Sequence, residues 1–179
     1  MPNAMHPRIA ELVAYLDKQH ENLRTAYELV PPKRRAIRPA AERWSPAEVV
    51  HHIMLVERNV SEKLGALVEE ARALPNESES SSLFPIPLVS LVELRTRRVR
   101  TVEYAEPHDT DAERVWQDYV ATRTALKRII AAGDGLALGA VSAPHVRLGP
   151  FSGYEWIAFA GAHAARHADQ IREMTISLA

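Results

Sequence analysis

The chain has 179 residues, 46% of them hydrophobic, so it can bury one sizeable core and we expect a single domain over residues 1–179. Its 22 basic and 23 acidic side chains give a formal net charge of -1, which argues against a nucleic acid or an anionic membrane as partner. The absence of cysteine excludes disulfides, thiolate metal ligands and a cysteine nucleophile, so a transition-metal site must be built from histidine and carboxylate.

The first predicted helix covers residues 6–30, where apolar side chains recur at steps of three and four. Its stripe is formed by Ile9, Val13, Leu16, His20, Leu23, Tyr27 and Val30. Pro31 and Pro32 end the helix. We interpret His20 as a core histidine bonded to its neighbours, with a fourth metal ligand or a donor to such a ligand as the alternative.

The second predicted helix begins in the sequence WSPAEVV, where Ser45 is a good N-cap and Glu48 completes a capping box. We expect this helix to extend to about Leu74. Its apolar stripe is formed by Val49, His52, Val56, Val60, Leu64 and Leu67. Because successive helical residues diverge by about 100°, His51 and His52 cannot both face the core, and the stripe selects His52.

Residues 75–111 begin with a stretch rich in serine and proline and are predicted to form a long connection with one short helix near residues 88–98. We interpret the basic run RTRRVR in this connection as a solvated face, because neither aromatic residues nor net positive charge accompany it. The third predicted helix covers residues 111–132 and ends at Gly133 and Gly135. Its stripe is formed by Val115, Tyr119, Thr122, Leu126 and Ile129.

A loop containing Pro144 and Pro150 leads into the fourth predicted helix, which begins near Gly153. Four amphipathic helices of this kind predict an all-α fold, a four-helix bundle. The 37 residues from Pro75 to Asp111 can form a crossover between parallel second and third helices, which needs at least about 12 extended residues. We therefore expect the up-down-down-up order.

The last helix carries the sequence GAHAARHADQIREM, in which polar residues occupy the apolar stripe. This stripe is formed by Trp156, Ala160, His163, His167, Gln170 and Met174. The two imidazoles stack on successive turns, close enough to bind one ion, and His52 is the candidate for a third ligand. From this helix alone, core histidines bonded to each other, to the backbone or to water explain the pattern equally well. Gln170 either orients a ligand or an imidazole, or fills the core.

Two segments together resemble a known family. These are WSPAEVVHH, with a histidine eight residues after the tryptophan, and HAARHADQI on the last helix. The chain is similar to the DinB-like superfamily of bacterial four-helix bundles, and its PHVRLGPFSGYEW loop is similar to the family's entry into the last helix. The resemblance implies an up-down-down-up bundle, often a homodimer, and a divalent metal held by three histidines. The family's three histidines fall on His52, His163 and His167.

Three neutral imidazoles leave a coordination position open, as in catalytic zinc sites. Zinc and nickel suit such ligands best, with iron and manganese as further candidates. We expect a metal-dependent enzyme acting on a small molecule, either hydrolase-like or a transferase that takes a low-molecular-weight thiol as cosubstrate, since the chain has no thiol. The alternative is a non-catalytic metal-binding dimeric scaffold or a stress-related binding protein, which a fourth protein ligand would favour.

Other candidate groups have weaker arguments. Glu48 lies one turn before His52 and could act as a base, but its capping role explains it without a function. His6, His108 and His145 lie near the chain end or in proline-containing loops and have no argument for a site. The N-terminal sequence shows no signal pattern and no run of 18 apolar residues occurs, so we expect a soluble, unprocessed protein in the cytoplasm.

Overall fold

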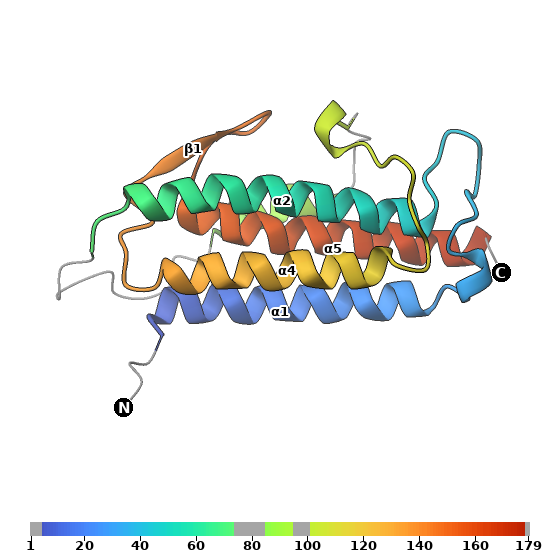
Figure 1. Cartoon of the computed structure of the whole chain (residues 1–179), viewed down its shortest axis with the longest axis horizontal. Coiled ribbons are helices and arrows are strands. Elements are labelled where there is room, and N and C mark those ends of the chain that lie inside the picture. The colour runs from blue at the N-terminus through green and yellow to red at the C-terminus, as the bar shows by residue number, and fades with distance from the viewer. Residues whose placement is uncertain (1–4, 74–84, 95–100, 178–179) are drawn as a thin grey trace.

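The computed structural model describes residues 5–73, 85–94 and 101–177. Four long helices lie side by side along one axis (Figure 1). They are α1 (Pro7–Glu28), α2 (Pro46–Glu70), α4 (Val115–Ala132) and α5 (Gly153–Ser177). The fold is thus predominantly helical, as expected of an all-α protein. The colour order in Figure 1 shows α1 and α5 running in one direction and α2 and α4 in the other.

The start of α2 follows the predicted capping box. The Ser45 hydroxyl accepts a hydrogen bond from the Glu48 backbone N–H at 3.2 Å, and the Glu48 carboxylate accepts one from the Ser45 N–H at 2.7 Å. The helix ends at Glu70, before the predicted Leu74, which lies outside the described residues. It ends there because the following backbone becomes extended, and the Arg72 carbonyl accepts a hydrogen bond from the Ala137 N–H at 2.8 Å.

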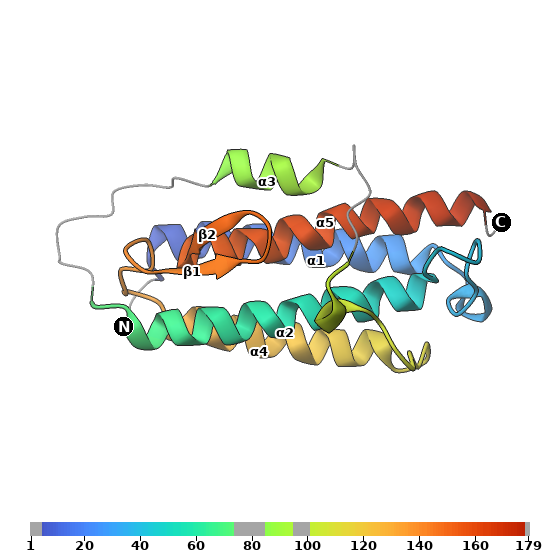
Figure 2. The same ribbon diagram turned by 90° about the horizontal axis from the view of Figure 1, so that it is seen from above.

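The connection between α2 and α4 contains α3 (Ile86–Glu93) and the 3-10 turn η2 (Glu103–Ala105), while a second 3-10 turn, η1 (Pro32–Arg34), follows α1. Figure 2 shows α3 alongside α5. It begins two residues before the helix predicted near residues 88–98 and ends at Glu93, because Leu94 leaves the helical conformation and its carbonyl accepts a hydrogen bond from Arg166 on α5; residues 95–98 lie outside the described residues. The RTRRVR run lies outside the described residues, so its interpretation stays a prediction.

The helix α4 begins at Val115 rather than at the predicted residue 111, because the Asp111 side chain accepts a hydrogen bond from the Glu113 N–H in a turn that precedes the helix. It ends at Ala132 as predicted, with Gly133 at its C-cap and Gly135 at a φ of 77°, a conformation that favours glycine. The predicted stripe is buried except for Ile129, which is only partly buried.

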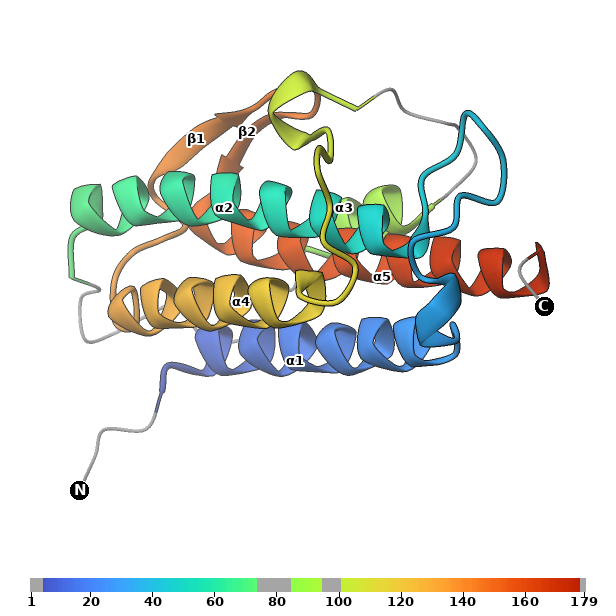
Figure 3. The same ribbon diagram turned by 45° about the vertical axis from the view of Figure 1, so that its right-hand side comes forward.

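The loop predicted before α5 contains an antiparallel hairpin of β1 (Ser142–His145) and β2 (Gly149–Ser152). Each strand has four residues and contains one proline, Pro144 or Pro150, which pair with each other in the register. Strands this short, with a proline in each, leave no alternating pattern in the sequence. Figure 3 shows the hairpin and the segment that carries η2 on the same side of α2. Among the described helices, none has both the length and the apolar composition needed to cross a bilayer.

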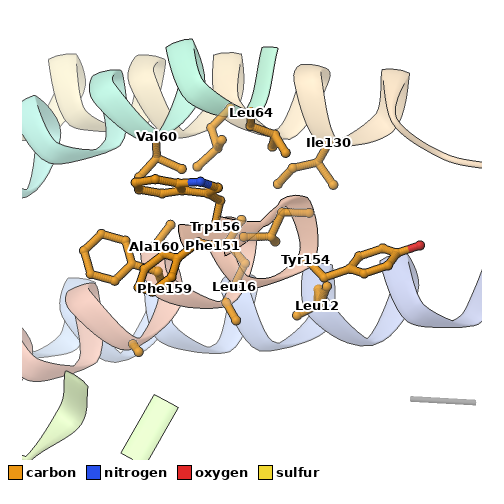
Figure 4. Close-up of a cluster of buried hydrophobic side chains, with 14 of the residues drawn as sticks. Leu12, Leu16, Val60, Leu64, Ile130, Phe151, Tyr154, Trp156, Phe159 and Ala160 are labelled. Atoms are coloured by element: carbon orange, nitrogen blue, oxygen red, sulfur yellow. The ribbon is translucent and has the colours of Figure 1, made fainter. Parts of the chain in front are cut away.

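The core contains two apolar clusters, with polar side chains near the boundary between them. The first cluster surrounds the start of α5, where Trp156 and Phe159 pack with residues of α1, α2 and α4 such as Leu16, Leu64 and Ile130 (Figure 4). The second surrounds the other half of α5. Polar residues fall between the two clusters on three helices, namely His20 on α1, Arg123 on α4 and His163 on α5, whereas His52 and Glu57 lie on either side of the boundary on α2. The candidate metal ligands therefore lie near the boundary between the two apolar clusters.

Candidate metal centre

The capping box fixes the phase of α2 and thereby turns His52 inward. The side chain is 6% exposed, and its Nδ1 donates a hydrogen bond to the Ala105 carbonyl at 2.8 Å. The ring of Trp44, just before the cap, lies 4.8 Å from the His52 ring, centroid to centroid. These contacts leave Nε2 as the free nitrogen of a ring that is held in one orientation.

The other two histidines lie one turn apart on α5. The Nε2 atoms of His163 and His167 are 3.1 Å apart, and the Nδ1 of His167 donates to the Gln170 side-chain oxygen at 2.7 Å. Gln170 therefore orients an imidazole in the structure, one of the two roles that the sequence left open. The Nδ1 of His163 is buried with no partner among the described residues.

The three rings converge on one point between α2 and α5. The Nε2 atoms of His52 and His163 are 3.3 Å apart, and one nitrogen from each of the three histidines lies within 4.8 Å of the others. A tetrahedral ion at about 2.0 to 2.1 Å from each ligand requires nitrogens about 3.3 Å apart. Since the Nδ1 atoms of His52 and His167 carry the protons, their Nε2 lone pairs face the centre. The triad could therefore hold a divalent metal ion.

Burial keeps the imidazoles of His52 and His163 in the neutral form that a metal requires. It lowers the pKa of His52 to about 4, against a smaller opposing effect of the bond to Ala105. It also lowers the pKa of His163 well below its ordinary value, and the neighbouring His167 and His52 lower it further. At pH 7, protons thus compete little with a cation for the nitrogens of His52 and His163.

Other sequence candidates lie outside the triad. The Nδ1 of His51 lies 2.8 Å from the Thr110 hydroxyl, and the ring of His20 stacks on Tyr119 of α4 at 5.6 Å between centroids. The carboxylate of Glu48 is held by its cap and by Arg38. In the described ranges, the triad is the only group of three or more histidine, aspartate or glutamate side chains placed to share an ion.

One residue with no sequence argument lies near the triad. The ring of His145, on β1, is 4.9 Å from that of Phe159, which is in turn 5.5 Å from the ring of His163. The sequence could not indicate this, because it depends on how the hairpin folds back over the long helices. The other histidines without a site argument stay apart from the triad: His6 caps α1 and His108 is exposed.

Two hollows on the surface of the described residues lie near α5. The first, of about 530 Å³, lies between α1, α3 and α5; charged side chains of both signs line it, and no triad histidine does. The second, which we term the hairpin cavity, has a volume of about 250 Å³ and lies under the hairpin tip. Its lining includes Asn59, Lys63, Tyr104, His145 and Trp156. Although smaller, it is connected to the triad by ring contacts from His145 to Phe159 and from Phe159 to His163.

Comparison with known proteins identifies a family for this arrangement. Residues 15–171 match a family model described as the DinB superfamily, which covers most of the chain. Neither the curated proteins nor the solved structures include a significant match.

Proposed function

Because the chain belongs to the DinB superfamily, whose members often bind metals, we propose that it is a metal-dependent enzyme acting on a small molecule. His52, His163 and His167 hold one divalent ion in this proposal. Zinc or nickel is the expected metal, because both favour imidazole, and iron or manganese are further candidates. The observation that carries the proposal is the convergence of the three Nε2 atoms at separations that suit one ion.

The surroundings of the triad support a functional ion. The Ala105 carbonyl and the Gln170 side chain each accept a hydrogen bond from the far nitrogen of a triad histidine, as the partners of metal-binding histidines usually do. Such partners fix the orientation and the protonated nitrogen of each ring. Their presence on two separate segments argues against a chance meeting of core histidines.

An open coordination position supports catalysis over a purely structural role. The described residues place no fourth histidine or carboxylate with the triad, and three protein ligands are the usual number in catalytic zinc sites. When bound, the ion supplies Lewis acidity that activates an incoming water or thiol. The reaction is therefore hydrolase-like, or a transfer to a low-molecular-weight thiol that enters as cosubstrate, because the chain contains no cysteine.

Several further features belong to the same proposal. We expect a single domain with the family's up-down-down-up helix order, which the helix directions in Figure 1 support, and a cytoplasmic homodimer. A metal-binding dimeric scaffold without catalysis is the alternative, and an ion sealed from outside ligands would favour it.

Metal analysis of the purified protein tests the proposal. We expect about one divalent ion per chain, and X-ray absorption spectroscopy should show nitrogen ligands near 2.0 to 2.1 Å, as for imidazole on zinc. A site with carboxylate oxygens as its only ligands would overturn the assignment of the triad. A protein that stays empty in excess zinc and nickel would overturn metal dependence itself.

A further inference from the structure

The hairpin cavity and the triad lie along the same pair of helices. Asn59 follows His52 by seven residues on α2, and Trp156 precedes His163 by seven residues on α5. Because α2 and α5 run in opposite directions, both steps lead the same way along the fold, by two helical turns or about 10 Å. Phe159 lies between, in ring contact with both His145 and His163. The cavity thus neighbours the proposed metal centre.

The hairpin cavity is lined by positive charge without negative charge. Lys63 contributes a positive charge, and no aspartate or glutamate belongs to the lining. Within the described ranges, Lys63 has no hydrogen bond or ion pair, unlike Lys127, which binds Asp17 at 2.9 Å. A partly buried lysine without a counterion favours an anionic ligand.

Further polar groups of the lining are donors suited to an anion. The Nδ1 of His145 accepts hydrogen bonds from the backbone N–H groups of Arg147 and Leu148 at 3.2 and 3.1 Å, so the neutral ring carries its proton on Nε2. The amide of Asn59 adds a donor on α2, next to Lys63 on the same helix. Two donors and one cation, from α2 and the hairpin, therefore line one cavity.

The remaining walls are aromatic and apolar. Tyr104 on η2 and Trp156 on α5 line the cavity together with Pro144 and Val146 of the hairpin. A volume of about 250 Å³ corresponds to roughly eight water molecules, so the space suits a ring-sized organic group and not a polymer. A mostly apolar lining with a few convergent polar groups is the common pattern of small-molecule sites.

We propose that the hairpin cavity binds a small organic anion, a carboxylate or phosphate ester on a ring-sized apolar group, with Lys63 as its charge partner. That this anion is the substrate of a reaction at the adjacent metal centre rests on the proposed function. That the anion binds in the cavity does not. The apolar group packs against Tyr104 and Trp156, and His145 and Asn59 donate to the anionic oxygens.

Three tryptophans make the site testable by NMR, because their indole N–H resonances report on different places. Trp156 lines the cavity, Trp44 contacts the triad residue His52, and Trp116 lies on α4 beside Tyr27. The full chain, first free of metal and then loaded with zinc, is titrated with benzoate, phenyl phosphate and the neutral benzamide. In the metal-free protein, both anions should shift the Trp156 resonance and bind about tenfold or more tightly than benzamide, as a charge-assisted contact predicts.

Lys63→Met should remove this preference for anions, whereas Lys33→Met removes an equal charge on the exposed turn η1 and should leave it unchanged. Tighter binding of phenyl phosphate or of benzoate would identify the anionic group. Equal binding of benzamide, a preference that survives Lys63→Met, or failure of every probe to shift Trp156 would overturn the proposal. A shift of Trp44 alone, and only with zinc present, would assign the anion to the metal centre and also overturn it. Because the first titrations use metal-free protein, their result does not depend on whether the triad binds an ion.

Discussion

Arg123 on α4 and Glu57 on α2 form an ion pair in the core. Their side chains are 4% and 1% exposed, the Arg123 Nε donates to the Glu57 carboxylate at 2.9 Å, and its Nη1 donates to the Leu16 carbonyl on α1 at 2.9 Å. The pair thus ties three of the long helices together. A buried charge is tolerated only while its partner is present.

Glu57→Gln should therefore destabilise the protein by about 3 to 5 kcal/mol, because it leaves the Arg123 guanidinium buried without a counterion. Asp17→Asn provides the control, since it breaks the Lys127–Asp17 pair, in which both side chains are at least 40% exposed, and should cost less than about 1 kcal/mol. Urea unfolding of both variants measures the difference. Equal losses of stability in the two variants would show that burial does not determine how much these ion pairs contribute to the free energy of unfolding.

The absence of a side chain at Gly161 allows α1 and α5 to approach closely. A Cβ atom at this position would lie 2.7 Å from Cδ1 of the Tyr15 ring. Gly161→Ala should then destabilise the fold by about 1 to 3 kcal/mol, since the clash outweighs the better helix propensity of alanine. At Gly65 on α2 no atom lies within 4 Å of such a Cβ, so Gly65→Ala should instead stabilise by about 0.5 to 1 kcal/mol. Thermal melts of the two variants should move in opposite directions.

The two adjacent histidines of α2 should differ in their effect on metal binding. His52→Ala removes a proposed ligand and should lose most of the affinity, with the helix intact because alanine is a good helix former. His51 instead contacts Thr110, so His51→Ala should cost no more than the roughly 10- to 100-fold typical of a residue near a metal site. Metal titration of both variants at one pH decides this. If His51→Ala empties the site and His52→Ala does not, the ligand assignment on α2 is wrong.

Cobalt substitution should separate an enzyme from a scaffold. If a coordination position is open, small thiols, azide or hydroxamates should change the visible spectrum of the cobalt-loaded protein, because they can bind the ion directly. An ion enclosed by four protein ligands would not respond. A spectrum that stays constant with all three ligands, at full cobalt loading, would favour the scaffold.

The metal-free protein should lose stability as the pH falls from 7 to 5. Burial lowers the pKa of His52 to about 4 and also lowers the pKa values of His163 and His20, whereas all three have ordinary values near 6.5 in the unfolded chain. The unfolded state therefore takes up protons that the folded state does not, and stability present above pH 6.5 is lost below it. His52 alone contributes about 2 kcal/mol over this range. Urea unfolding at several pH values measures the slope, which should be smaller in His52→Leu; a slope that this change does not alter would contradict the assignment.

Helical periodicity was sufficient to bring the three histidines to one place. The stripe of α2 separates His52 from His51, and the stripe of α5 includes both His163 and His167, because side chains rotate by about 100° per residue around each helix. The capping box at Ser45 was equally predictable, since it depends on a few neighbouring residues. Local rules thus accounted for most of the four long helices.

The buried ion pair and the hairpin could not be anticipated in the same way. Glu57 and Arg123 do fall at helical spacing from buried neighbours, at positions 53, 60, 119 and 126, but a charged residue is usually assigned to the surface. Only the meeting of α2 and α4 gives each charge its partner. The hairpin is too short to show alternation, and it is positioned by the long helices beneath it.

The contact between His52 and His163 also joins parts of the chain that are 111 residues apart. A shared ion would act there as a cross-link between α2 and α5 in a chain that has no cysteine for a disulfide. In the loop-entropy model, closing a loop of about 100 residues raises the free energy of the unfolded state by roughly 4 to 5 kcal/mol. The free energy of metal binding also adds to that of folding. Shortage of the metal would then expose the chain to unfolding and proteolysis, and the amount of protein in the cell would follow the metal supply.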